Sequence, residues 1–136
     1  MINKIKSTKR NQRILIVDDE PSLLSALVDK FTRAGFTALV AKDGKEGLHS
    51  AFKNHPDLIL LDIIMPVMDG VAMMHELRKD PWGKNASIII LTNYDTNDSQ
   101  LFQITTDSPS YYLVKSNTSI DRVLEKVKEI LDSKKA

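Results

Sequence analysis

Five short apolar runs recur along the chain, and they constrain its fold more than any other feature. The runs consist mostly of β-branched residues and leucine, and they are continuous instead of alternating with polar residues. Continuous runs of this kind are typical of strands that are buried on both faces of a parallel sheet. The five runs are Ile14–Val17, Thr37–Val40, Leu58–Leu61, Ile88–Leu91 and Tyr112–Val114.

Helical patterns follow each of these runs. The order of elements along the chain is therefore βαβαβαβαβα. Parallel strands joined by right-handed crossovers predict an α/β fold with a doubly wound, five-stranded parallel sheet and five helices on its two faces. The signals are Pro21 to Phe31 with a stop at Gly35, a capping-box-like pair at Asp43 and Glu46, the apolar face Val71, Met74 and Leu77, a weaker pattern over residues 97–105, and Ile120 to Leu131 with Asn117 or Thr118 as the N-cap.

Composition excludes several classes of protein. The 136 residues include no cysteine and carry a formal net charge of +1, which excludes disulfides and gives no reason to expect a nucleic-acid partner. No apolar run is long enough for a membrane-spanning helix or a signal peptide. We therefore expect a cytoplasmic protein with a polar N-terminal leader over residues 1–12 and one domain over residues 13–133.

Charged and hydroxyl side chains come directly after the predicted strands or end them. They are Asp18, Asp19, Asp62, Thr92 and Lys115. Each has an ordinary interpretation when taken alone, such as a helix cap or a solvated lysine. In a doubly wound sheet, however, ligands bind beyond the carboxyl ends of the strands, and there the residues would lie together.

Such a cluster of carboxylates favours a bound cation. Two unit charges about 4 Å apart repel by about 4 kcal/mol at an effective dielectric constant of about 20. Oxygen ligands without histidine or cysteine favour Mg²⁺. The chemistry that fits is phosphoryl transfer onto Asp62, with Lys115 and Thr92 contacting the phosphoryl oxygens.

Four segments, in this order and on these strand ends, resemble the receiver domains of bacterial response regulators in two-component signalling, a flavodoxin-like family with strand order 2-1-3-4-5. The resemblance extends over about residues 13–131. The segments are Val17-Asp18-Asp19-Glu20-Pro21, Leu61-Asp62-Ile63-Ile64-Met65-Pro66 with Asp69-Gly70, Leu91-Thr92, and Tyr112-Leu113-Val114-Lys115.

The resemblance implies a role for each matching residue. Asp62 would accept a phosphoryl group from a phosphohistidine of a sensor histidine kinase or a histidine phosphotransfer protein. Mg²⁺ would be held by Asp18, Asp19, Asp62 and the backbone carbonyl of Ile64. The other implied roles are phosphoryl contacts from Thr92 and Lys115, and a conformational switch formed by Thr92 with Tyr112.

The implied output is a contact with a downstream protein through the surface of the fourth helix, fifth strand and fifth helix. The chain is not expected to be an enzyme, and it would be a monomer or a phosphorylation-dependent dimer. Only residues 132–136 follow Leu131, so we expect no attached DNA-binding domain and no direct contact with nucleic acid.

Two residues depart from the family pattern. Ser116 follows Lys115 where proline is usual, and Asn93 follows Thr92 where a small residue is usual. Two further residues, Ile64 and Tyr94, border the path of a water that would attack the phosphoryl group. We hypothesise that this pair slows the loss of phosphate.

Two other functions stay open at this point. The departures at Ser116 and Asn93 are compatible with a receiver-fold interaction module that takes no phosphate. A Mg²⁺-dependent phosphohydrolase with Asp62 as its nucleophile is the other. It is disfavoured because Ile64 stands where such enzymes usually carry an acidic residue.

Overall fold

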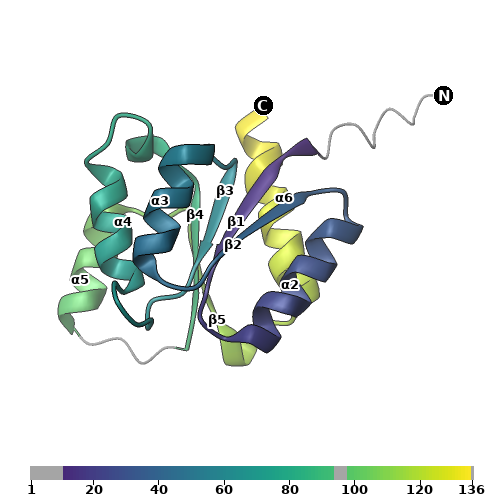
Figure 1. Ribbon diagram of the computed structural model, residues 1–136, viewed down its shortest axis with the longest axis horizontal. Coiled ribbons are helices and arrows are strands. Elements are labelled where there is room, and N and C mark those ends of the chain that lie inside the picture. Colours follow the sequence, from purple (N-terminus) through teal and green to yellow (C-terminus); the bar gives the residue numbers. More distant parts are fainter. Residues whose placement is uncertain (1–10, 94–97, 136) are drawn as a thin grey trace.

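A computed structural model describes residues 11–93 and 98–135 of the chain. It contains a five-stranded parallel sheet with helices on both faces (Figure 1), as the sequence predicts. The elements are β1 (Arg13–Val17), α2 (Pro21–Arg33), β2 (Thr37–Ala41), α3 (Gly44–Asn54), β3 (Leu58–Leu61), α4 (Gly70–Arg78), β4 (Ile88–Thr92), α5 (Asp98–Asp107), β5 (Tyr111–Val114) and α6 (Ile120–Lys135), with short 3-10 turns η2 (Gly83–Asn85) and η3 (Lys115–Asn117).

The strand order is β2-β1-β3-β4-β5, and every neighbouring pair is parallel. The chain therefore moves outward from β1 to β2 and then returns past β1 to β3. The strand order reverses between β1 and β3, and this is the place where doubly wound sheets bind ligands. Val17 pairs with Leu61 at the carboxyl ends of these two strands, so the residues that follow them start out as neighbours.

The sheet separates two apolar layers. Leu15, Val17 and other residues on one face pack under α3, α4 and α5, whereas Ile14 and Ile16 on the other face pack under α2 and α6 (Figure 1). All four of these β1 side chains are essentially inaccessible to solvent. Burial on both faces explains why the strands are continuous apolar runs.

Two predicted helix boundaries are confirmed, one by its hydrogen bonds and the other by its backbone conformation. The Asp43 carboxylate accepts from the Glu46 backbone N–H at 2.8 Å, and the Glu46 carboxylate accepts from the Lys42 N–H at 2.9 Å. Gly35 follows the last turn of α2 with a φ of 96°, a left-handed conformation that glycine adopts without steric cost.

Other boundaries differ from the prediction. The N-cap of α6 is Ser119, whose hydroxyl accepts from the Arg122 N–H at 3.1 Å. The predicted caps were wrong because Asn117 belongs to η3 and the Thr118 hydroxyl donates to the Val114 carbonyl at 2.7 Å. Helix α5 runs to Asp107, two residues beyond its predicted end, and the predicted start at residue 97 lies outside the described residues.

No helix within residues 11–93 and 98–135 is long and apolar enough to cross a membrane.

Candidate functional site

The carboxyl ends of β1, β3, β4 and β5 bring the predicted site residues together. Main-chain hydrogen bonds fix the first two of them: the Asp18 N–H donates to the Ala41 carbonyl at 3.1 Å, and the Asp62 N–H donates to the Val17 carbonyl at 2.9 Å. Both carboxylates are almost fully buried. Their positions are thus set by the sheet itself and not by a mobile loop.

The Lys115 ammonium group links these carboxylates. Its Nζ lies 2.8 Å from Asp18 Oδ2, 3.3 Å from Asp62 Oδ2 and 3.3 Å from Glu20 Oε1. Burial lowers the pKa of Lys115, but its contacts with Asp18 and Asp62 outweigh burial and raise the pKa above its ordinary value. The lysine is therefore a fixed positive charge. The contact with Glu20 was not predicted, because Glu20 was not among the predicted site residues.

Asp18 carries an electrostatic cost in this site. Its Oδ1 accepts from the Glu20 N–H at 2.9 Å and its Oδ2 faces Lys115. Burial nevertheless raises the pKa of Asp18 above its ordinary value, and the nearby Asp62 raises it further. A bound cation would lower this cost.

The three aspartates can provide ligands for such a cation. Carboxylate oxygens of Asp18, Asp19 and Asp62 lie within 4.8 Å of one another. The Asp62 Oδ1 also accepts from the Ile63 N–H at 2.8 Å, which orients its carboxylate. Asp19 is exposed, so the cluster opens to solvent on one side. A set of hard oxygen donors with an open side fits Mg²⁺, which retains several of its waters.

Thr92 ends β4, pairs with Val114 one residue before Lys115, and is fully buried. Its hydroxyl oxygen has no hydrogen-bond partner among the described residues. A buried hydroxyl without a partner costs about 1–3 kcal/mol. The site therefore holds a hydrogen-bond donor for which the described part of the chain supplies no acceptor.

Asp69 and Gly70, at the end of the loop between β3 and α4, each have a structural role. The Asp69 carboxylate caps α4 by accepting from the Ala72 N–H at 2.8 Å. Gly70 packs against the backbone beside the cluster, where a Cβ atom would lie 2.0 Å from the Asp62 carbonyl oxygen. Only glycine permits this approach, which holds the loop against Asp62.

The same loop carries two exposed apolar side chains. Ile64 is 52% exposed and Val67 is 77% exposed. Val67 also has a φ of 68°, a left-handed conformation that is strained for a β-branched residue. No pattern in the sequence predicted this strain.

The remaining predicted positions lie near the site or outside the described residues. Tyr112 packs into the core cluster on the α4 side, whereas Tyr111 contacts Lys126 of α6, with Nζ 4.0 Å from the ring centroid. The two tyrosines thus face opposite sides of the sheet, as predicted. Ser116 lies in η3, Asn93 is exposed, and Tyr94 lies outside the described residues.

Comparison with known proteins places this chain in a family. The family model for the response regulator receiver domain matches residues 14–128. Among curated relatives, the alkaline phosphatase synthesis transcriptional regulatory protein PhoP of Bacillus subtilis is 41% identical over 69 residues, which are 51% of this chain and 29% of the relative. The chain spans about a third of the length of the curated relatives it matches.

Solved structures agree with the sequence matches. A CheY-like response regulator receiver domain protein from Methanospirillum hungatei has a TM-score of 0.82 and 27% identity, covering 91% of this chain and 96% of that chain. The response regulator protein TrrA from Thermotoga maritima, solved in complex with Mg²⁺ and BeF, has a TM-score of 0.74 and 37% identity, covering 87% of this chain and 97% of that chain.

Proposed function

The chain belongs to the response regulator receiver domain family, and from this premise we propose that it is a phosphorylation-controlled signalling switch with Asp62 as its phosphoacceptor. The observation that carries the proposal is the contact of Lys115 with both Asp18 and Asp62. The buried Thr92 hydroxyl, on the strand that pairs with β5, adds a donor that has no acceptor among the described residues. A phosphoryl group on Asp62 would supply acceptors for both donors.

The donor would be the phosphohistidine of a sensor histidine kinase or a histidine phosphotransfer protein. An Asp62 carboxylate oxygen attacks the phosphorus, and a new bond between oxygen and phosphorus forms. The bond between phosphorus and the histidine nitrogen breaks, and that nitrogen keeps the electron pair. The Lys115 ammonium balances the charge on the phosphoryl oxygens, and the Thr92 hydroxyl donates to one of them.

The carboxylates of Asp18, Asp19 and Asp62, with the backbone carbonyl of Ile64, would hold Mg²⁺. The ion, when bound, neutralises negative charge on the carboxylates and the phosphoryl oxygens. Two observations support this assignment. The three carboxylates lie close enough to share one ion, and the Thermotoga maritima relative was solved with Mg²⁺ and BeF.

The output would pass through the surface formed by α5, β5 and α6. Movement of Thr92 toward the phosphoryl group would vacate space beside β5, into which Tyr112 could turn. Phosphorylation then favours one of two conformations through contacts that exist in only one of them. Phe102 on α5 is 73% exposed and Tyr111 on β5 is 40% exposed, so this surface offers aromatic contacts to a downstream protein.

Acetyl phosphate with Mg²⁺, followed by intact mass measurement, tests the proposal. We expect a gain of one phosphoryl group that saturates, requires Mg²⁺ and is lost in Asp62→Asn. Asp69→Asn is the matched control, because Asp69 caps α4 and takes no part in the proposed chemistry. No gain in mass would favour the interaction module, and sustained turnover of acetyl phosphate would favour the hydrolase.

A further inference from the structure

Strand β2 lies at an edge of the sheet, and no segment within residues 11–93 and 98–135 pairs with its outer side. Edge strands in folded proteins usually carry a lysine, a proline or a bulge that prevents another strand from pairing with them. The sequence of β2, Thr-Ala-Leu-Val-Ala, contains no such residue, and its register with β1 is continuous over all five positions. This edge is open to strand pairing.

The main-chain groups of two β2 residues point away from the sheet. The Thr37 N–H donates to the Gln12 carbonyl, and the Ala41 carbonyl accepts from the Asp18 N–H, so the odd-numbered residues face β1. The N–H and C=O groups of Ala38 and Val40 consequently face outward. They are donors and acceptors in the spacing that an added strand requires.

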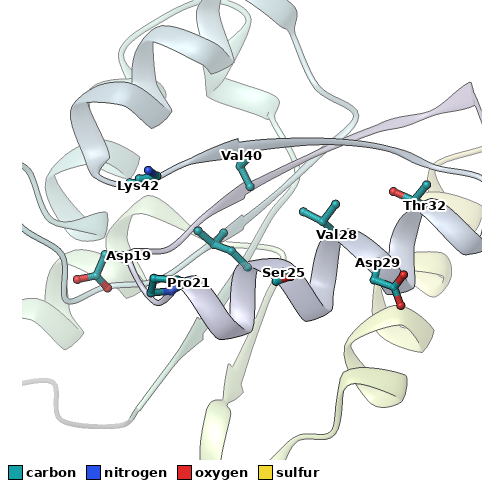
Figure 2. A pocket seen from close by; sticks show the side chains of 9 residues that line it. Asp19, Pro21, Ser25, Val28, Asp29, Thr32, Val40 and Lys42 are labelled. Carbon is teal, nitrogen blue, oxygen red and sulfur yellow. The ribbon is translucent and has the colours of Figure 1, made fainter.

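A groove lies beside this edge on the α2 side of the sheet. Its volume is about 630 Å³, and its apolar lining comes from Pro21, Leu24, Val28 and Val40. Charged groups of Asp19, Asp29 and Lys42 also line it. Figure 2 shows the Val40 side chain pointing toward α2 and Val28 pointing back toward β2, with Lys42 at one end of the groove and Thr32 near the other. The groove is suited to apolar side chains.

A second hollow lies at the same edge, toward α3. It has a volume of about 450 Å³ and is lined by Val40, Asp43, Lys45, Glu46 and His49. Three of its five lining residues are charged, so a side chain that enters this hollow would lie among those charged groups. Successive side chains of a strand point to opposite faces of its sheet, so an added strand would place alternate residues in the apolar groove and in this hollow.

We propose that the β2 edge binds an extended segment of a partner protein as a sixth strand of the sheet. Apolar side chains at alternate positions enter the groove against α2, and polar side chains between them face α3. Strand addition of this kind takes affinity from main-chain hydrogen bonds and selectivity from the side-chain pockets. The proposal does not depend on phosphorylation of Asp62.

Charge at the edge defines the segment further. The side chains of Lys42 and Lys45 form no ion pair within the part of the chain that the structure describes. Lys42 directly follows β2 and Lys45 lies in the first turn of α3. The neighbouring carboxylates of Asp43 and Glu46 accept from backbone N–H groups, so the two ammonium groups would complement an acidic residue of the partner.

Amide hydrogen exchange on the full chain, without phosphodonor, tests the proposal. The probe is a nine-residue peptide in which valine alternates with serine and which ends in glutamate; the control peptide has the same composition with its valines in one block. We expect the alternating peptide to slow the exchange of the Ala38 and Val40 amides at least tenfold and the control peptide to leave it unchanged. Unchanged exchange of these two amides at millimolar peptide would overturn the proposal.

A pair of variants separates strand pairing from binding of an apolar molecule. Val40→Pro removes one outward N–H but no bond to β1, whereas Val40→Ala keeps that N–H and shortens the side chain. We expect Val40→Pro to abolish the protection of Ala38 and Val40→Ala to retain most of it. Equal binding by both variants would reject strand addition. Concentration-dependent dimerisation that protects the same amides without peptide would instead assign the edge to a second copy.

Discussion

The Nζ atom of Lys115 lies closer to Asp18 (2.8 Å) than to the proposed phosphoacceptor Asp62 (3.3 Å). The lysine therefore balances the charge of a carboxylate that we assign to metal binding, as well as that of the acceptor. A cation bound at Asp18 would neutralise part of the carboxylate charge that Lys115 now balances. The ammonium would then be available to the phosphoryl group, so cation binding and phosphorylation should favour each other.

Removal of the lysine should weaken the metal-free fold. Lys115→Ala leaves two buried carboxylates without their shared partner, and we expect the free energy of unfolding to fall by about 1–3 kcal/mol. Urea denaturation in the presence of a chelator measures this change. The matched control is Lys30→Ala, which breaks a solvent-exposed pair with Asp121 and should cost less than about 1 kcal/mol. Equal losses in the two variants would contradict the role of Lys115.

Thr92 should show the opposite relation between stability and function. Thr92→Val replaces a buried hydroxyl that has no partner in the described part of the chain with a methyl group of similar size. We expect the free energy of unfolding of the metal-free variant to rise by about 1 kcal/mol. In the presence of Mg²⁺, we expect the variant to bind beryllium fluoride, a mimic of the phosphoryl group, more weakly than the parent protein does.

Thermal unfolding and titration of the mimic measure these two effects. The control is Thr37→Val on the exposed edge strand, which should change stability by less than about 0.5 kcal/mol and leave affinity for the mimic unchanged. If Thr92→Val destabilised the protein, the hydroxyl would have a partner in the folded state.

The sequence predicted the fold, and the gathering of these residues at one edge of the sheet, for a physical reason. Strands buried on both faces must be continuous apolar runs, and parallel strands place the residues after them at one edge. Asp18, Asp62 and Lys115 could be assigned to that edge before their distances were known. The distances themselves depend on side-chain rotamers and on the exact turn after each strand, which no local pattern encodes.

Features that arise from loop closure could not be predicted. The chain between β3 and α4 must bring Gly70 against the Asp62 carbonyl, and Val67 takes a left-handed φ as a consequence of that path. Local propensity alone would exclude valine there. The cap of α6 was mispredicted for a similar reason, because η3 takes up residues 115–117 and moves the helix start to Ser119.

Relief of the strain at Val67 should stabilise the protein. Val67→Gly removes a left-handed cost of about 1–2 kcal/mol and adds about 0.5–1 kcal/mol of chain entropy to the unfolded state. We expect a net gain of about 0.5–1 kcal/mol in urea denaturation. Val40→Gly is the control, since Val40 is also an exposed valine but lies in an extended strand. It should lose stability, and a loss in both variants would show that Val67 is not strained.

The lifetime of the phosphorylated state should depend on Ile64. This side chain lies two residues past Asp62, is 52% exposed and carries no group that could orient a water. Ile64→Asn introduces an amide that can hold a water near the phosphoryl group, which should lower the barrier to hydrolysis.

A barrier lowered by about 1 kcal/mol corresponds to roughly fivefold faster loss of phosphate. Timed decay of radiolabelled phosphoprotein after removal of the donor measures this rate, alone and combined with Tyr94→Glu. Phe52→Asn provides the control, because Phe52 is an exposed apolar residue on α3, and its decay rate should equal that of the parent protein. An unchanged rate in the double variant would mean that water reaches the phosphoryl group by a path that Ile64 and Tyr94 do not border.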